Sequence, residues 1–192
     1  KYNNTYRWVP LNGDIAGLCV QTDVTNDPWF SPAGYTRGQI KNAIKLAWNP
    51  NKTQRDSIYN IGVNPVVSFP GQGITLFGDK TFTSKPSAFD RINVRRLLIE
   101  IRRRVRSVAN NFIFEPNREV TLNRFSASVN PILKQIQAQS GVDRFLVKID
   151  TSTTTQADVE NNTIRGKIFV QPTKAIEFVS LDFVVSNSGV SV

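Results

Sequence analysis

The sequence predicts an α+β fold in which a mixed β-sheet packs against two main helices. Two stretches carry apolar residues at steps of three and four, the spacing that puts side chains on one stripe of an α-helix. The first stripe consists of Val94, Leu97, Leu98, Ile101, Val105 and Val108, and the second consists of Phe125, Val129, Ile132, Leu133 and Ile136. Apolar residues alternate with polar ones in residues 145–149 and again in 176–186, which is typical of half-buried strands. We expect the two helices to lie against each other and on the sheet.

The polar face of the first helix carries a dense strip of positive charge. Its arginines are Arg91, Arg95, Arg96, Arg102, Arg103, Arg104 and Arg106. Glu100 is the only acid among them, so few pairs at i,i+4 spacing can offset the repulsion within the helix. The strip predicts either an external acidic partner or a solvated face whose arginine stems cover apolar surface.

The composition of the chain favours a globular domain that binds something acidic. At 192 residues and 40% hydrophobic, the chain can bury a real core. The formal net charge of +9 favours nucleic acid, an anionic surface or an acidic protein, without choosing among them. No apolar run approaches the roughly 20 residues of a membrane-spanning helix, so membrane insertion is not expected. Because the chain begins at Lys1 and contains no methionine, we interpret it as a fragment of something longer.

The residues that usually carry catalysis are scarce. The chain has no histidine, the commonest general base and metal ligand, and its single cysteine, Cys19, excludes a disulfide framework and a zinc cluster. We expect Cys19 in a buried strand. No nucleophile motif is present, so the sequence predicts no enzyme, no cofactor and no metal site. A two-carboxylate or Ser–Lys site is the alternative that remains open.

The N-terminal half is expected to mix short strands with helical turns. Residues 15–20 follow an Asn-Gly-Asp turn and predict a buried strand, and the aromatics of the next loop, Trp29 and Phe30, are expected to seal a core edge. Residues 40–48 suggest a helix, with a strand as the alternative. Residues 53–59 predict one or two helical turns capped by Thr53. The strands predicted at residues 63–69 and 74–77 form a hairpin-like pattern.

The glycine-rich piece GQGITLFGDKT is a near miss for two phosphate-binding motifs. In a P-loop the second glycine directly precedes the lysine, whereas here Asp79 separates Gly78 from Lys80 and adds a negative charge. A dinucleotide fingerprint needs a helix after its third glycine, whereas Ile74 to Phe77 resemble a strand. The sequence therefore disfavours nucleotide binding.

The second main helix is expected to begin at Asn117 as N-cap, with Glu119 in its first turn, and to end at Gly141. Pro131 is expected to kink it. Residues 151–162 are polar and loop-like, and strands are expected at residues 164–171 and 176–186. Gly166 indicates a bulge or a close contact. Residues 1–186 are expected to form one core domain, and residues 187–192 a short uncharged C-terminal extension.

The order of these motifs resembles the conserved core of the tail sheath proteins of contractile bacteriophage tails, a family shared with pyocin-like injection machines. The matching pieces are VPLNGDIAGLCVQTDV, PWFSPAG, IGVNPVVSFPGQGITLFGDKT, INVRRLLIEIRRRVR, NFIFEPN and IRGKIFVQPTKAIEFVSLDFVVS. Together they span nearly the whole chain in the family's order. The resemblance does not separate a phage from a phage-derived injection machine.

The resemblance implies a structural subunit that stacks in helical rings around an inner tail tube and contracts to drive the tube through the host envelope. It implies a homo-oligomer with the tail tube, the baseplate and the tail terminator as partners, located in the virion and assembled in the host cytoplasm. It also implies that an extended terminal arm exchanges strands between subunits, for which the candidates are Lys167, Phe169, Glu177, Val179, Leu181, Phe183 and Val185. The family's N-terminal arm and outer domains are absent from these residues.

The same resemblance suggests that basic residues of the core face an acidic tube. The candidate strip is Arg95, Arg96, Arg102, Arg103 and Arg106. The alternative is a basic nucleic-acid-binding domain that uses the same helix. Nucleic acid is the less favoured partner, because aromatic residues do not interleave with the basic run as they do in single-strand binding platforms.

Overall fold

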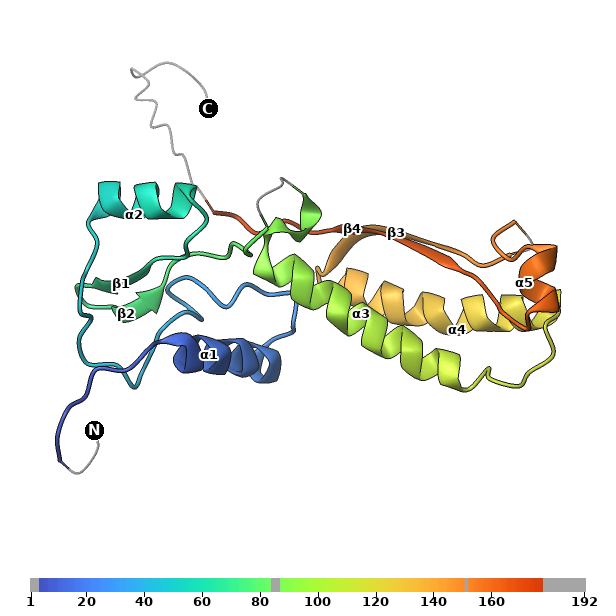
Figure 1. The fold of residues 1–192 in the computed structure, drawn as a ribbon, viewed down its shortest axis with the longest axis horizontal. Coiled ribbons are helices and arrows are strands. Elements are labelled where there is room, and N and C mark those ends of the chain that lie inside the picture. The colour runs from blue at the N-terminus through green and yellow to red at the C-terminus, as the bar shows by residue number, and fades with distance from the viewer. Residues whose placement is uncertain (1–3, 84–86, 151, 178–192) are drawn as a thin grey trace, which may run out of the picture.

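The computed structural model describes residues 4–83, 87–150 and 152–177, which form two lobes lying end to end (Figure 1). The N-terminal lobe contains α1 (Asn12–Thr25), α2 (Lys52–Asn60), β1 (Val66–Phe69) and β2 (Gly73–Leu76). The C-terminal lobe contains the 3₁₀ helix η1 (Ala88–Asp90), α3 (Ile92–Asn110), α4 (Glu119–Ala138), β3 (Val142–Lys148), α5 (Gln156–Glu160) and β4 (Lys167–Pro172). The predicted α+β class is confirmed.

The strands do not share one sheet. Within the described residues, β1 pairs only with β2 and β3 pairs only with β4, and both pairs are antiparallel. The predicted single mixed sheet is therefore replaced by two small antiparallel ones. The reason is that each lobe closes its own apolar core, so strands from different lobes never come within pairing distance.

The core of the N-terminal lobe is small and consists of Leu18, Ile40, Ile74 and Leu76. The predicted hairpin is confirmed, with Val66 opposite Leu76 and Phe69 opposite Gly73. The predicted strand at residues 15–20 is wrong, because this segment belongs to α1. Leu18 and Thr22 are the buried residues of that helix, with Leu11 and Ile15 packed beside them. Steps of three and four, not two, connect these positions.

Cys19 correspondingly lies on a helix and is only half-buried, so its predicted place in a buried strand is also wrong. Burial raises the pKa of the Cys19 thiol, although the nearby Arg96 opposes this shift. The thiol therefore stays protonated at neutral pH.

The predicted helix at residues 40–48 is also wrong. Its first residue, Ile40, donates its N–H to the carbonyl of Ile74 at 2.8 Å, and Leu76 donates to the carbonyl of Gly38 at 2.8 Å. These bonds hold the start of the segment against β2 as an irregular edge. Gly38 permits the approach, because a Cβ atom there would lie 2.6 Å from the Leu76 carbonyl oxygen. Tertiary pairing thus overrides the helical spacing of the segment.

Helix α2 confirms the predicted helical turns but not their cap. The side chain of Asn51 accepts the N–H of Gln54, and the side chain of Gln54 accepts the N–H of Asn51, each at 2.9 Å. This reciprocal pair is a capping box. Asn51, two residues before the predicted Thr53, is therefore the N-cap.

In the C-terminal lobe, α3 and α4 lie side by side and the β3–β4 hairpin covers them (Figure 1). Both predicted stripes face the core, whose buried members are Trp29, Leu97, Ile101, Val129, Leu133, Ile136 and Val142. Trp29 reaches this core from the N-terminal half of the chain, is 5% exposed, and donates its Nε1–H to the carbonyl of Gln139 at 3.0 Å. The expectation that the aromatic loop seals a core edge is confirmed for Trp29.

Helix α4 begins one residue later than predicted. Its N-cap is Arg118, whose side chain makes no capping bond, while the amide of Asn117 donates to the carbonyl of Thr163 at 3.4 Å. Asn117 is therefore not the cap, although Glu119 lies in the first turn as expected. Pro131 lies inside the helix. Ser140, with φ of 61°, takes the left-handed position after the end of the helix, so Gly141 is not the residue that terminates α4.

The connection between β3 and β4 is more ordered than predicted. Instead of a loop throughout, it contains α5, whose N-cap Thr155 forms a capping box with Asp158. Gly166 makes the predicted close contact, because a Cβ atom there would lie 2.5 Å from Cγ1 of Ile149. Of the strand predicted at residues 176–186, the structure describes only Ile176 and Glu177, and neither is in a strand.

The other residues of that prediction lie outside the described residues, as does the predicted extension, residues 187–192. The candidates concerned are Val179, Leu181, Phe183 and Val185.

Candidate functional site

The arginines of α3 divide into two groups, and the first group is used inside the chain. Arg96 is the most enclosed: its side chain is 14% exposed, and it donates to the carbonyl oxygen of Cys19 at 2.7 Å and to that of Phe30 at 3.4 Å. It also forms an ion pair with Asp23. Arg96 thus joins α3 to the end of α1, and its guanidinium is largely covered.

Glu100 likewise binds Arg103 and Arg104 within the chain. Its side chain is 8% exposed and accepts from Nε of Arg104 at 2.7 Å and from Nη2 of Arg103 at 3.0 Å. Burial opposes ionisation of Glu100, but the hydrogen bonds from both arginines outweigh it and lower the pKa of the carboxyl. The one acid of the predicted strip therefore neutralises part of it from the buried side.

The second group forms what we call the outer stripe, which consists of Arg95, Ile99, Arg102 and Arg106. These residues follow at steps of four, three and four, so they lie on one line along the exposed side of α3. All four are exposed, including Ile99 at 59%. Among the described residues, Arg102 and Arg106 have no side-chain hydrogen bond or ion pair, and Arg95 only stacks over Phe89 at 5.7 Å.

The structure therefore separates the five arginines predicted to face a tube. Arg95, Arg102 and Arg106 lie together on the outer stripe. Arg96 is bound to α1, and Arg103, although its side chain is 77% exposed, is bound to Glu100. Among the described residues, the stripe of arginines without an ion pair is therefore narrower than the sequence suggests. It also includes the exposed Ile99.

The candidate strand-exchange residues also fall into separate places. Lys167 and Phe169 lie on β4 with their side chains exposed. In the described part of the sheet, β3 and β4 each have one edge without a partner strand. Glu177 lies beyond β4, outside any strand. It makes a different set of contacts, which sequence reasoning missed.

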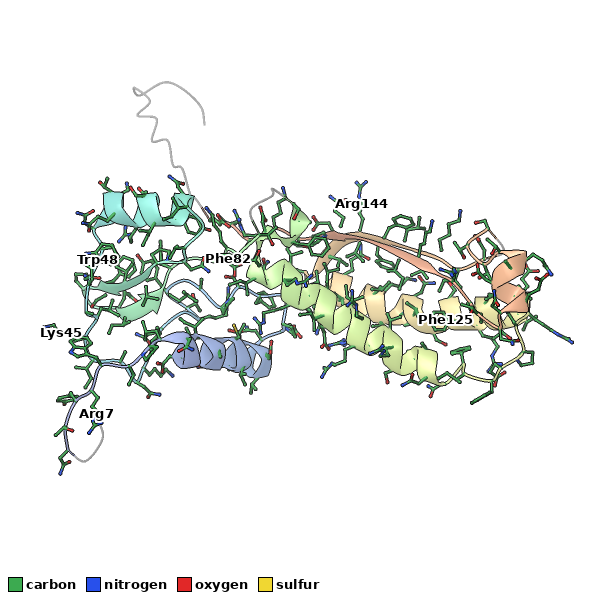
Figure 2. All side chains as sticks on the ribbon, viewed as in Figure 1. Arg7, Lys45, Trp48, Phe82, Phe125 and Arg144 are labelled. Carbon is green, nitrogen blue, oxygen red and sulfur yellow. The ribbon has the colours of Figure 1, made fainter. Side chains whose placement is uncertain are left out.

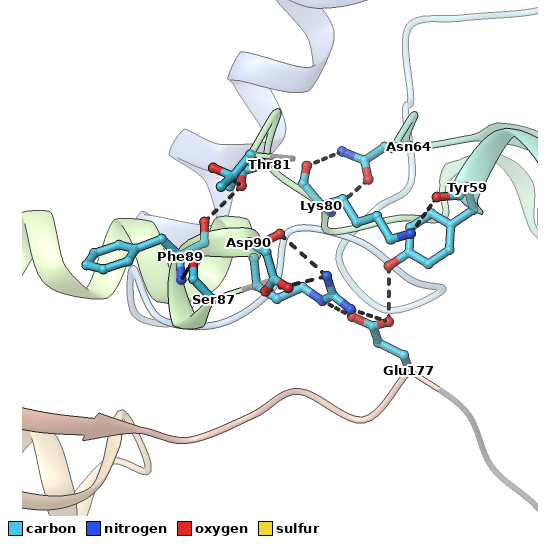
Figure 3. Close-up of polar contacts among 10 residues, drawn as sticks. Tyr59, Asn64, Lys80, Thr81, Ser87, Phe89, Asp90 and Glu177 are labelled. Atoms are coloured by element: carbon cyan, nitrogen blue, oxygen red, sulfur yellow. Dashed lines mark hydrogen bonds and ion pairs between the residues drawn. The ribbon is translucent and has the colours of Figure 1, made fainter. Parts of the chain in front are cut away.

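Glu177 joins the two lobes at what we call the lobe junction (Figure 3). Its carboxylate accepts from the hydroxyl of Tyr59 on α2 at 3.1 Å, and from Nη2 of Arg91 at 3.2 Å and from Nε of the same arginine. Arg91 is the residue directly before α3. Burial, with a further contribution from Glu177, raises the pKa of Tyr59 to about 12, so this hydroxyl remains a donor.

The segment between the lobes is held beside that junction. Asn64 accepts the backbone N–H of Lys80 and donates to the carbonyl of Lys80, each at 2.8 Å (Figure 3). The ammonium of Lys80 donates to the carbonyl of Tyr59 at 2.5 Å and lies 3.9 Å from the centre of the Tyr59 ring. The lysine of the near-miss phosphate motif is thus bound within the protein, which supports the reading against nucleotide binding.

A groove of about 770 Å³ runs along this junction. Trp29, Phe30, Phe77 and Asp79 line it, together with Glu177. Asp79 is 5% exposed, and neither of its carboxylate oxygens has a hydrogen-bond partner of good geometry among the described residues. Burial raises the pKa of Asp79 to about 6, against smaller opposing contributions from Ser31 and from the N–H of Asn93.

The described residues provide no group of three or more acidic or cysteine side chains placed to hold a metal ion. Of the helices that the structure describes, none has the length and apolar character needed to cross a bilayer.

Chains in solved structures of contractile injection machines superpose on this fold. A chain in the baseplate of the anti-feeding prophage superposes with a TM-score of 0.84 at 21% identity, covering 92% of this chain and 50% of that one. The contracted sheath complex of the extracellular contractile injection system PVC superposes with a TM-score of 0.80 at 24% identity, covering 88% and 49%. The chain therefore shares its fold with chains of these two contractile assemblies.

Sequence comparison identifies the family. The profile of the phage tail sheath protein central domain matches residues 1–82, and that of the phage tail sheath C-terminal domain matches residues 84–186. The tail sheath proteins of Vibrio phage KVP40 and Enterobacteria phage T4 are 45% and 41% identical to it, each over 98% of this chain. The chain belongs to the phage tail sheath family. It spans 28% and 29% of the length of these two relatives.

Proposed function

We propose that this chain is the core of a structural subunit of a contractile tail, one that polymerises helically around an inner tube. The observation that carries the proposal is the match to tail sheath proteins over 98% of the chain, in both of its lobes. On contraction the sheath drives the tube through the host envelope. The work comes from a free-energy difference between two packings of the subunits, so no catalytic activity is needed.

The location and further partners follow from this role. The subunit is part of the virion tail and is assembled in the host cytoplasm, with the baseplate and the tail terminator at the two ends of the sheath. Residues 1–186 act as one core domain and residues 187–192 as a C-terminal extension. The unity of the core is supported by Trp29, which enters the C-terminal lobe, and by Glu177, which binds both lobes.

The outer stripe of α3 is the surface for an acidic tube. Arg102 and Arg106 support this assignment because both are exposed and neither has a side-chain partner among the described residues. Arg95 extends the same line. Arg103 contributes charge at the side, whereas Arg96 acts from within by fixing α3 to α1. Exposed charges of this kind mainly set orientation and salt dependence.

Strand exchange uses the edges of the β3–β4 hairpin. Each strand has an unpaired edge in the described sheet, and such an edge can accept a strand from another chain through main-chain hydrogen bonds. Lys167 and Phe169 belong to one of these strands. The arm that would be exchanged begins beyond Glu177, and it carries the alternating residues Val179, Leu181, Phe183 and Val185.

The test uses the full-length parent protein and compares two double variants. We expect the wild-type protein to form hollow striated tubes in electron micrographs. Arg102→Gln with Arg106→Gln should leave the sheath able to form but reduce its co-assembly with tubes about tenfold at physiological salt. The matched control, Arg124→Gln with Lys134→Gln, removes the same charge from exposed positions of α4.

Two results would count against the proposal. Wild-type protein that stays monomeric would remove the sheath function altogether. Equal losses in both double variants would show that net charge matters and the outer stripe does not. Binding of the wild type to duplex DNA with steep salt dependence, lost in the α3 variant only, would favour the nucleic-acid alternative instead.

A further inference from the structure

The β3–β4 hairpin also has a solvent-facing side, whereas the proposed strand exchange uses only the edges of its strands. Its inward side chains pack on the core of the C-terminal lobe, and they are Phe145, Val147, Ile168 and Val170. The opposite side, here called the outer sheet face, consists of Arg144, Leu146, Lys148, Lys167, Phe169 and Gln171. Arg144 points away from the helices in Figure 2. The helices cover only the inward side, so the outer sheet face is open in the described structure.

The centre of the outer sheet face is apolar. Leu146 lies directly opposite Phe169 in the strand register, and the two residues are 58% and 53% exposed. A cross-strand pair of large apolar side chains is ordinarily stabilising when it is covered. Here the pair is about half exposed to solvent, at the middle of the outer sheet face.

The charges around this centre are all positive, and two of them face each other across the two strands. Lys148 lies directly opposite Lys167, and Arg144 lies opposite the neutral Gln171. Like charges directly across an antiparallel pair destabilise the sheet. Among the described residues, none of these three cations forms an ion pair or a side-chain hydrogen bond, although Asp150 feels the charge of Lys148. In the part of the chain that the structure describes, no ion pair offsets this repulsion.

We propose that the outer sheet face docks an acidic element of a neighbouring copy of the full-length protein. This inference rests on the proposed function, because neighbours in a sheath are copies of one chain. The carboxylates of that element lie between Lys148 and Lys167 and beside Arg144, and an apolar side chain at its centre covers Leu146 and Phe169. Charge complementarity selects this partner, since an intervening carboxylate turns a repulsive lysine pair into two attractive contacts.

The contact is distinct from strand exchange. Addition of a strand at an edge uses main-chain groups in the plane of the sheet and leaves both faces as they were. Covering the outer sheet face uses side chains that point out of that plane. The outer stripe is also separate, because α3 packs on the inward side of the hairpin. One subunit can therefore contact a tube and a neighbour at the same time.

The test measures subunit stability and assembly separately in the full-length protein. Lys167→Gln removes the like-charge pair, so the melting temperature of the unassembled subunit should rise by about 1–3 °C. The same substitution should raise the critical concentration for assembly about fivefold, measured by sedimentation and electron microscopy. Phe169→Ser should leave the melting temperature nearly unchanged, because the ring is half exposed, and should raise the critical concentration about tenfold.

Matched controls separate the face from general effects of charge and apolarity. Lys134→Gln removes one exposed lysine from α4, and Phe82→Ser removes a fully exposed phenylalanine near the lobe junction; both should assemble as the wild type does. Assembly unchanged in Lys167→Gln and Phe169→Ser overturns the docking proposal but leaves the sheath function intact. If the critical concentration for assembly rises equally in these variants and in the controls, the docking proposal is overturned as well. Wild-type protein that never associates overturns both proposals.

Discussion

At the scale of single residues, Asp79 is the most unusual group in the chain. It lies on the groove at the lobe junction, 5% exposed, with neither carboxylate oxygen hydrogen-bonded among the described residues. A buried carboxylate without partners costs free energy whenever it is charged. The nearby Asn93 has an Oδ1 without a hydrogen-bond partner among the described residues as well.

Asp79→Asn should therefore stabilise the protein at neutral pH. The pKa of Asp79 is about 6 in the folded protein against an ordinary value of 3.8. Between these values the native state binds a proton that the unfolded state does not, so the wild-type free energy of unfolding falls as pH rises through this window. The variant avoids the loss and should gain about 3 kcal/mol at pH 7.5, but only about 0.5 kcal/mol at pH 4. Urea unfolding at both pH values measures the difference.

The control for this prediction is Asp56→Asn, at an exposed acid that lines the same groove. Its effect should stay within about 0.5 kcal/mol at both pH values, because a solvated carboxylate has little to gain from neutralisation. A gain in Asp79→Asn that is as large at pH 4 as at pH 7.5 would contradict the linkage argument.

At the scale of elements, the end of α4 depends on a close contact more than on a helix-stop signal. Ser140 adopts the left-handed conformation there, with φ of 61°, while Gly141 is buried against Ile136 and Trp29. A Cβ atom at Gly141 would lie 2.6 Å from Cγ2 of Ile136 and 3.0 Å from the Trp29 ring. The glycine thus lets β3 begin directly on the core.

Gly141→Ala should destabilise the C-terminal lobe by about 1–3 kcal/mol, because the added methyl group must displace well-packed side chains. Trp29 fluorescence should change with it, since that ring lies at the contact. The matched substitution is Gly17→Ala in α1, where no atom lies within 4 Å of the new Cβ. Gly17→Ala should stabilise by up to about 1 kcal/mol, because alanine is the better helix former. Equal effects at the two sites would refute the steric explanation.

At the scale of the whole molecule, three of the contacts among the described residues join the lobes across long stretches of sequence. Trp29 enters the C-terminal core, Arg96 of α3 binds the end of α1 through Asp23, and Glu177 binds Tyr59 and Arg91. The partners in the last contact are 118 and 86 residues apart along the chain. Glu177 also directly precedes the candidate exchange arm in the sequence.

Glu177→Gln should loosen the lobe junction without unfolding either lobe. The amide keeps the size of the side chain but loses the charge-assisted bonds to Arg91, at a cost of about 1–2 kcal/mol. Hydrogen exchange should increase in α2 and in the first turn of α3, while the core of α4 stays protected. Glu119→Gln, at an exposed acid without an ion pair among the described residues, is the control. Unchanged exchange at the junction in Glu177→Gln would show that the contact does not hold the lobes.

The arrangement of the charged residues shows where sequence reasoning stops. The arginine strip on α3 was predictable, because its positions follow from helical geometry alone. Its division into an outer stripe and a bound group was not. Arg96 finds Asp23, which lies 73 residues earlier, and no local pattern in the sequence connects them. The like-charge pair of Lys148 and Lys167 depends on strand register in the same way.

The sequence by itself determined α3, α4, the β1–β2 hairpin, the strand pattern of β3 and the sheath family, because stripes, turns and motif order are written within short stretches of chain. Only the tertiary structure decided α1, whose apolar residues lie on several sides of the helix, among them buried Leu18 and exposed Val20 and Val24. It also decided the segment after Ile40, which is held at β2. Local preferences amount to a few tenths of a kcal/mol per residue, so packing and pairing with distant partners overrule them wherever they are weak.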